Sequence, residues 1–231
     1  MLCRMVFSVA PYNIFVKSKM FGAEVLFVRF RKGFRMIQKT NTAKNIRCLC
    51  EAAVFIAIAA VFALLKFPPF RIDLWIFGGS IDFVMLPLFL MCWRLDMKWS
   101  LPACFIFGMV KFLITGDSIS VYGGLLAVML DYVLAYGVIG FSGFFRKLKG
   151  GLFWCILAGS LARFAVHFIS GVTIYKLAFG DSVELFNISF DHTMAAFYSL
   201  VYNGSYMLGE MLYCLALAAV LYKPLSKLPR S

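Results

Sequence analysis

The hydrophobic residues of this chain fall into six long runs that are separated by short polar segments. Each run is close to, or longer than, the roughly 20 residues that an α-helix needs to cross a bilayer. The pattern predicts six membrane spans, at residues 48–65, 74–92, 99–115, 118–145, 151–175 and 193–222. The second span contains Gly78-Gly79, so we expect an irregular first turn there. The predicted fold is an all-α integral membrane protein, built as a six-transmembrane-helix bundle.

The composition supports a membrane protein. Hydrophobic residues make up 62% of the 231 residues and charged residues 15%, whereas a soluble domain has about 45–50% and about 25%. So few polar groups cannot cover the surface of a soluble domain, which excludes a soluble globular enzyme. The same composition excludes intrinsic disorder.

Positive charge is concentrated near the N-terminus. The formal net charge is +12, and residues 1–47 hold ten of the 23 Lys and Arg residues with one acidic residue, Glu24. Beside a hydrophobic bundle, such an arm is expected to lie on the anionic cytoplasmic membrane surface rather than to bind nucleic acid. We expect a basic arm at 1–43, a membrane domain at 44–224 and a short cytoplasmic tail at 225–231. Met20 and Met36 are internal alternative starts, so the arm is expected to be dispensable or to include a misassigned start.

Charges between the spans predict the orientation. Lys and Arg gather after spans two, four and six, at Arg94, Lys98, Arg146, Lys147, Lys149, Lys223, Lys227 and Arg230. The segments after spans three and five are mainly acidic and contain Asp117, Lys176, Asp181, Glu184 and Asp191. Cytoplasmic loops of membrane proteins are enriched in Lys and Arg. The sequence therefore predicts a multi-pass protein of the cell membrane with both termini in the cytoplasm.

Each predicted span also contains one formally charged residue, and these are Glu51, Asp82, Lys111, Asp131, Arg163 and Glu210. A charge at the centre of a spanning helix costs roughly 2.5–3.5 kcal/mol on insertion scales, so it usually faces a cavity or a partner. Glu51 and Asp82 lie near span ends, where we expect them to reach an interface, and Lys111 is expected to snorkel toward one. The other three charges are candidates for a functional site.

The fifth span places polar or small residues on one face. Arg163, His167, Gly171 and Tyr175 recur every four residues, which aligns them along a helix. This spacing predicts either a polar seam between helices, with Gly171 allowing close packing, or the wall of a ligand cavity. Further polar and aromatic groups come from spans four and six, namely Asp131, Tyr132, Tyr198 and Asn203. A carboxylate, aromatic rings and an amide suit a small cationic or heteroaromatic ligand, and packing contacts could equally satisfy them.

Motifs for several other chemistries are absent from the sequence. The chain has no P-loop, no dinucleotide-binding glycine motif and no zinc-protease motif, so it cannot hydrolyse ATP through a P-loop of its own. The seven cysteines lack metal-ligand spacing and a disulfide pattern, and we predict no metal site and no cofactor. A transporter of this kind must draw energy from a gradient or from a partner.

Four blocks of the sequence resemble the thiamine-specific substrate-binding (S) component of energy-coupling factor (ECF) vitamin transporters. The blocks are GGSI with MLP at 78–87, LDYVLAY at 130–136, ARF with HFISG at 162–171 and YSLVYNGSYML at 198–208. The resemblance covers residues from about 44 to 224. It implies a six-helix bundle that binds thiamine with high affinity in a pocket open to the outside. It also implies that no residue is catalytic.

The resemblance assigns roles to individual residues. Asp131 takes the place of an acidic thiamine ligand that is often Glu in this family. The implied thiamine-binding residues are Asp131, Tyr132, His167, Gly171, Tyr175, Tyr198 and Asn203. The family also implies partners in the membrane, a transmembrane coupling subunit and two ABC-type ATPases. Docking on the coupling subunit uses an Ala-x-x-x-Ala face, which Ala53 and Ala57 match here.

Three alternatives remain. An S component for another vitamin would share the architecture but not the 198–207 block. A small secondary transporter would need inverted repeats or paired broken helices, and the sequence has no convincing internal repeat. The segment Gly140-Phe141-Ser142-Gly143 fits the pattern of an intramembrane serine protease with His167 as its base. That alternative is distant, because Ser142 falls at the predicted cytoplasmic end of span four and His167 well along span five.

Overall fold

The computed structural model describes residues 23–75, 78–115, 124–178, 182–185, 188–191 and 195–228. The chain divides into two compact units, Met1–Ala43 and Lys44–Ser231. The second unit contains every contact discussed below.

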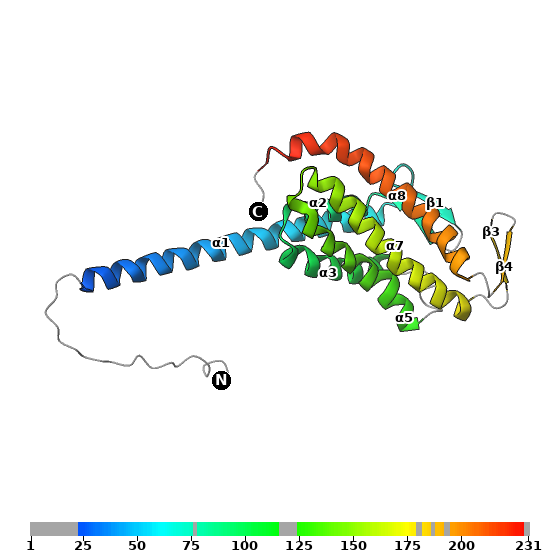
Figure 1. The fold of residues 1–231 in the computed structure, drawn as a ribbon, viewed down its shortest axis with the longest axis horizontal. Helices are drawn as coiled ribbons and strands as arrows, with labels where there is room; N and C mark the ends of the chain where they lie inside the picture. The colour runs from blue at the N-terminus through cyan, green and yellow to red at the C-terminus, as the bar shows by residue number, and fades with distance from the viewer. Residues whose placement is uncertain are drawn as a thin grey trace. The chain divides into compact units, whose positions relative to one another are not determined.

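Helices dominate the second unit (Figure 1). They are the C-terminal part of α1 (Ala23–Leu64), then α2 (Met85–Arg94), α3 (Met97–Thr115), α7 (Gly151–Ala178) and α8 (Ala195–Leu225). Among the described residues, four helical segments are long and apolar enough to cross a membrane, namely Thr42–Leu64, Met97–Ile114, Gly151–Thr173 and Ala195–Leu225. These four segments agree with predicted spans one, three, five and six. The protein is therefore a multi-pass helical membrane protein.

The fourth predicted span is a succession of different helix types. Its first residues, 118–123, lie outside the described part of the chain. The described part starts with α5 (Gly124–Val128), continues as the π-helical segment η1 (Met129–Leu134) and the short α6 (Ala135–Gly137), and ends as the 3-10 helical segment η2 (Val138–Lys147). Hydrophobicity alone does not distinguish these types, because all of them can present apolar side chains to a bilayer. The type of helix around Asp131 bears on the site described below.

The second predicted span differs from the structure at its start. The described residues of this part, 74–75 and 78–84, form strands and a turn instead of a helix. β1 (Arg71–Trp75) and β2 (Gly78–Asp82) pair as an antiparallel hairpin in which Arg71 lies opposite Asp82. Gly79 has a φ of 78°, which suits glycine and interrupts a helix. Of the described residues in this region, only those of α2 are helical. Its ten residues span about 15 Å at 1.5 Å per residue, half of a bilayer core. A second hairpin joins β3 (Ser182–Leu185) to β4 (Ile188–Asp191).

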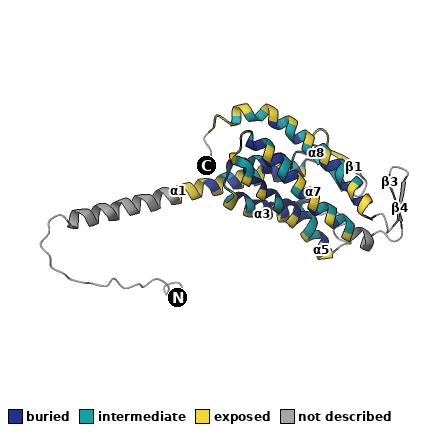
Figure 2. Cartoon of the chain, in the orientation of Figure 1, coloured by how far each residue is buried: buried dark blue, intermediate teal, exposed yellow. Residues whose placement is uncertain are grey.

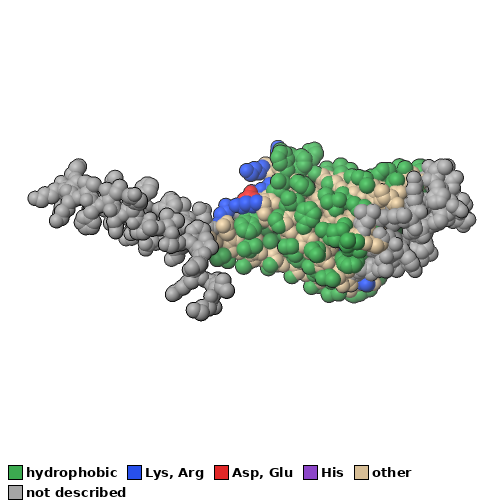
Figure 3. All heavy atoms as spheres, turned by 90° about the horizontal axis from the view of Figure 1, so that it is seen from below, with side chains coloured by type: hydrophobic (Ala, Val, Ile, Leu, Met, Phe, Trp, Pro, Cys, Tyr) green, Lys and Arg blue, Asp and Glu red, His purple; other side chains and the backbone are tan. Residues whose placement is uncertain are grey.

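The core surrounds α2, nine of whose ten residues are buried. Phe89 and Trp93 of α2 and Phe107 of α3 are among its largest fully buried side chains. Figure 2 shows buried residues concentrated where the helices face one another. Large apolar side chains such as Leu113 and Val220 are instead exposed, and hydrophobic side chains cover much of the described surface seen in Figure 3. An exposed apolar surface of this extent is expected for helices that face lipid.

Two ion pairs connect Arg94 and Arg146, near the ends of α2 and η2, to other parts of the chain. Arg94 at the end of α2 pairs with Glu51 of α1, and Arg146 of η2 pairs with Asp96. Arg146 also donates a hydrogen bond to the carbonyl oxygen of Arg94 at 3.0 Å. The carboxylate of Glu51, which was predicted to reach an interface, therefore joins α1 to α2.

Candidate functional site

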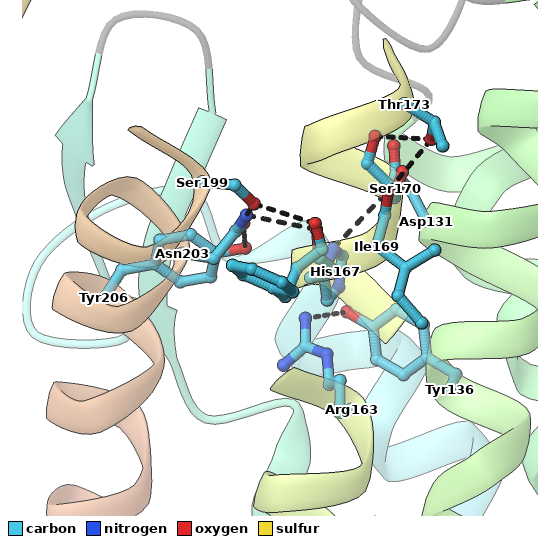
Figure 4. Close-up of polar contacts among 11 residues, drawn as sticks. Asp131, Tyr136, Arg163, His167, Ile169, Ser170, Thr173, Ser199, Asn203 and Tyr206 are labelled. Atoms are coloured by element: carbon cyan, nitrogen blue, oxygen red, sulfur yellow. Dashed lines mark hydrogen bonds and ion pairs between the residues drawn. The ribbon is translucent and has the colours of Figure 1, made fainter. Parts of the chain in front are cut away.

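The candidate site begins with a contact between η1 and α7. Oδ1 of Asp131 lies 3.3 Å from Nδ1 of His167. Nε2, the other ring nitrogen of His167, is buried and has no hydrogen-bond partner among the residues that the structure describes. Buried polar groups nearly always have a partner, so this nitrogen is a candidate contact for a ligand. Figure 4 shows Asp131 and His167 facing each other from the two helices.

A network of hydrogen bonds joins α7 to α8 beside His167. Nδ2 of Asn203 donates to the carbonyl oxygen of His167 and to Oγ of Ser199, both at 3.1 Å. Oγ of Ser199 donates to the carbonyl oxygen of Phe168 at 2.9 Å, and the hydroxyl of Tyr206 donates to Oδ1 of Asn203 at 2.9 Å. The amide of Asn203 is therefore engaged at both ends by protein groups. Its contacts with the backbone of α7 are those of a polar interhelical seam.

Gly171 makes this close approach of the two helices possible. A Cβ atom at this position would lie 2.9 Å from Nδ2 of Asn203 and would overlap Oγ of Ser199. Any side chain here would have to displace the side chains of Ser199 and Asn203 from their present contacts with α7. This face of α7 was predicted to be either a polar seam between helices or the wall of a ligand cavity. Close helix packing accounts for Gly171, and His167 remains the candidate ligand group on this face.

Three tyrosines of α8 form a continuous aromatic ladder. The rings of Tyr198 and Tyr202 stack with centroids 5.6 Å apart, and the ring of Tyr206 meets that of Tyr202 edge-on at 5.9 Å. Tyr206 also lies edge-on to His167, with centroids 6.5 Å apart. The ladder connects the predicted site residue Tyr198 to the histidine. Tyr202 and Tyr206 were not predicted, although they follow Tyr198 at successive intervals of four residues, which could have indicated them.

The remaining predicted site residues are Tyr132, Tyr175, Ala53 and Ala57. The ring of Tyr132 packs edge-on against Phe112 of α3 with centroids 5.3 Å apart, so this ring contacts α3. Tyr175 belongs to α7, but its side chain lies outside those that the structure describes. Ala53 and Ala57 are exposed on α1, whereas Ala52 and Ala59 are buried.

A layer of buried charges lies one turn of α7 from His167. Nη1 of Arg163 is 2.7 Å from Oε2 of Glu210, and Nη2 donates to the hydroxyl of Tyr136 at 3.2 Å. Nζ of Lys111 lies 3.5 Å from Oδ2 of Asp82, and Oδ1 of Asp82 accepts a hydrogen bond from the amide of Val84. Asp82 and Lys111 are both 6% exposed. The predictions that Asp82 reaches an interface and that Lys111 snorkels are therefore wrong, because each charge has its partner inside the bundle.

The geometry also bears on the protease alternative. Ser142 is buried in η2 and faces Gly159 of α7, where an added Cβ would lie 3.3 Å from that of Ser142. His167 lies eight residues further along α7, which corresponds to about 12 Å. These two residues therefore cannot act as a nucleophile and base, and the protease hypothesis is wrong.

Comparison with known proteins identifies the family. A family model described as "Thiamine transporter protein" matches residues 49–229, most of the chain. The protein belongs to the thiamine transporter family. Over 214 residues it is 28% identical to the thiamine transporter ThiT of Bacillus subtilis (strain 168), and the match covers 83% of this chain and 98% of that protein. The resemblance drawn from the sequence blocks is confirmed at the level of the family.

A solved structure of ThiT from Listeria monocytogenes shares the fold. It is 23% identical in sequence, covers 78% of this chain and 96% of its own, and superposes with a TM-score of 0.62. This likeness supports a helical bundle of the membrane type for the thiamine transporter family member described here.

Proposed function

We propose that the protein binds thiamine with high affinity between η1, α7 and α8 and serves in its uptake across the cell membrane. The contact between Asp131 and His167 carries the proposal. It brings a carboxylate beside an imidazole whose Nε2 is buried and has no partner among the described residues. An acceptor and an unsatisfied ring nitrogen in one place suit the charged and hydrogen-bonding heterocycles of thiamine.

The charge balance of the bundle supports a cationic ligand. The buried ion pairs Arg163–Glu210 and Lys111–Asp82 each sum to zero. Within the described part of the chain, Asp131 has no Lys or Arg partner, and its ion-pairing contact is with His167. Thiamine carries one permanent positive charge on its thiazolium ring, which would compensate the carboxylate. Aromatic faces such as those of the tyrosine ladder attract cations of this kind.

Partner proteins would supply the energy for uptake. We propose that the chain is the S component of an ECF-type ABC transporter and binds a transmembrane coupling subunit and two ABC-type ATPases. The exposed pair Ala53 and Ala57 on α1 supports docking, because small residues four apart allow close helix contact. The chain is proposed to have cytoplasmic termini and a site that opens to the outside, which the distribution of Lys and Arg along the sequence supports.

Calorimetric titration of the detergent-purified protein with thiamine tests the proposed ligand, with riboflavin and biotin as controls. Saturable binding of thiamine at one site per chain, with no binding of the controls, is expected. Binding of riboflavin or biotin instead would indicate an S component for another vitamin. Absence of thiamine binding by a folded sample would contradict the proposal.

Reconstitution into liposomes tests the source of energy. Thiamine uptake is expected only when a coupling subunit and ATPases are present and ATP is supplied on their side. Uptake by the protein alone, driven by an ion gradient, would indicate a secondary transporter and would contradict the S-component assignment.

A further inference from the structure

The fourth membrane segment changes its helix type at Asp131. Residues Met129–Leu134 are π-helical, and the amide of Ala135 donates to the carbonyl oxygen of Leu130, five residues earlier. The chain is α-helical before this segment, in α5, and directly after it, in α6. A π-helical turn holds one residue more than an α-helical turn, and such turns are frequent at functional sites.

This extra residue accounts for the alignment of two contacts with α7. Asp131 contacts His167, with 3.3 Å between Oδ1 and Nδ1. Tyr136 contacts Arg163, whose guanidinium carbon lies 4.6 Å from the centre of the tyrosine ring. The two partners on α7 are four residues apart, whereas Asp131 and Tyr136 are five apart. Figure 4 shows Asp131 beside His167 and Tyr136 beside Arg163, with both contacts directed to α7.

A regular α-helix could not make both contacts. Residues four apart on an α-helix lie nearly above each other, but residues five apart are rotated by about 140°. If residues 129–136 were α-helical and Tyr136 kept its contact with Arg163, Asp131 would turn away from His167. Hydrogen bonds between residues five apart bring positions 131 and 136 back onto one face. The π-helical register is therefore what allows Asp131 to face His167.

Gly108 of α3 leaves room for the widened turn. A Cβ atom at this position would lie 2.5 Å from the carbonyl oxygen of Tyr132 and 3.0 Å from Cα of Val133. Both atoms belong to the backbone of η1, so they could move only if the segment itself moved. Tyr132 packs on Phe112, one turn further along α3, and this contact holds the same segment against α3.

We propose that Gly108 and the π-helical segment Met129–Leu134 together act as a positioning device that sets Asp131 against His167 and thereby determines thiamine affinity. None of the residues of this device other than Asp131 needs to touch the ligand. The part of this inference that concerns affinity rests on the proposed function, and the part that concerns register does not.

The substitution Gly108→Ala tests the device, with Gly140→Ala as its matched control. Gly140 lies at the contact of α3 with η2, and its added Cβ would lie 2.5 Å from Cα of Leu101. Each substitution places a methyl group against the backbone of a neighbouring helical segment, so both are expected to lower thermal stability. Only Gly108→Ala is expected to weaken thiamine binding in calorimetry, by about tenfold or more, because a hydrogen bond to a charged group is lost. Equal effects of the two substitutions on affinity would overturn the proposal.

A longer carboxylate side chain at position 131 tests whether Gly108→Ala weakens thiamine binding by misplacing Asp131 or by damaging the fold in general. Asp131→Glu extends the side chain by one methylene group. In the Gly108→Ala protein this substitution is expected to restore thiamine affinity. In the wild-type protein it is expected to give no gain in thiamine affinity. A merely structural defect would not respond to that change. Lack of rescue would contradict the positioning role.

A measurement without thiamine tests the register directly. The chain has two histidines, His167 and His192, so imidazole nitrogen signals in NMR spectra can be assigned with His192→Gln. In Gly108→Ala, the Nδ1 signal of His167 is expected to move toward its position in Asp131→Asn, and in Gly140→Ala it should stay in place. An unchanged signal in Gly108→Ala would overturn the inference. If the signal moves but the wild-type protein does not bind thiamine, the register stands and the proposed function fails.

Discussion

Nη1 of Arg163 lies 2.7 Å from Oε2 of Glu210, and the two side chains are 9% and 5% exposed. This ion pair joins α7 to α8 one turn of α7 before His167, on the same face as the histidine. Each charge is tolerated in the interior because the other one neutralises it. The layer beneath the candidate site is thus a neutral support that holds the two helices that carry His167 and Asn203.

Breaking this ion pair from one side should destabilise the protein. Arg163→Met leaves Glu210 as an uncompensated buried carboxylate, and we expect a loss of about 3–5 kcal/mol in the free energy of unfolding. The double change Arg163→Met with Glu210→Gln removes both charges and should recover much of that loss. Chemical unfolding in detergent measures both variants. A double variant as unstable as Arg163→Met would contradict the account of this layer.

Gly171 should tolerate no side chain. Gly171→Ala places a methyl group against Asn203 and Ser199, and overpacking of this kind is expected to cost about 1–3 kcal/mol of stability. Gly204→Ala, on the facing helix, is the control, because its Cβ would meet only the ring of Phe164, at 3.9 Å. Thermal unfolding should separate the two variants. Equal melting temperatures would show that α7 and α8 do not approach as closely as described.

The carboxylate of Asp131 should dominate the affinity for thiamine. Asp131→Asn keeps the shape of the side chain but removes its charge, and we expect affinity to fall by about tenfold or more, as for other hydrogen bonds to charged groups. Asp96→Asn is the matched control, because it neutralises a carboxylate that pairs with Arg146 at the helix ends. Calorimetry of both proteins measures the difference. Undiminished binding by Asp131→Asn would place the ligand elsewhere.

The exposed alanines of α1 should matter for transport and not for binding. Introducing Trp at both Ala53 and Ala57 should abolish ATP-dependent uptake in reconstituted liposomes, because bulky side chains prevent close helix contact. Thiamine affinity in detergent should stay unchanged. Ala165→Trp is the control at an exposed alanine of α7. Full uptake by the double Trp variant would contradict docking through this face.

Four of the six predicted spans and the main contact of the site were accessible from the sequence. Hydrophobic runs are long and continuous in α3, α7 and α8, so their boundaries differ from the structure by a few residues at most. The contact of Asp131 with His167 joins two residues that the sequence resemblance had paired in one pocket. A resemblance carries such pairings because relatives share the three-dimensional arrangement, which spacing along one chain cannot provide.

Other features depend on three-dimensional contacts that a hydropathy pattern does not contain. The hydropathy pattern did not reveal the hairpin of β1 and β2, because its apolar residues are followed in the sequence by the apolar residues of the buried helix α2. The π-helical turn at Met129–Leu134 has no distinct composition, since one extra residue per turn leaves the hydrophobicity unchanged. The partner of Lys111 is Asp82, 29 positions earlier, and only the folded arrangement brings these charges together.

The position of thiamine in an experimentally determined structure of the complex tests the central claim most directly. We predict thiamine beside Asp131, with a polar atom within hydrogen-bond distance of Nε2 of His167, between η1, α7 and α8. Thiamine bound at a place that touches neither Asp131 nor His167 would contradict it.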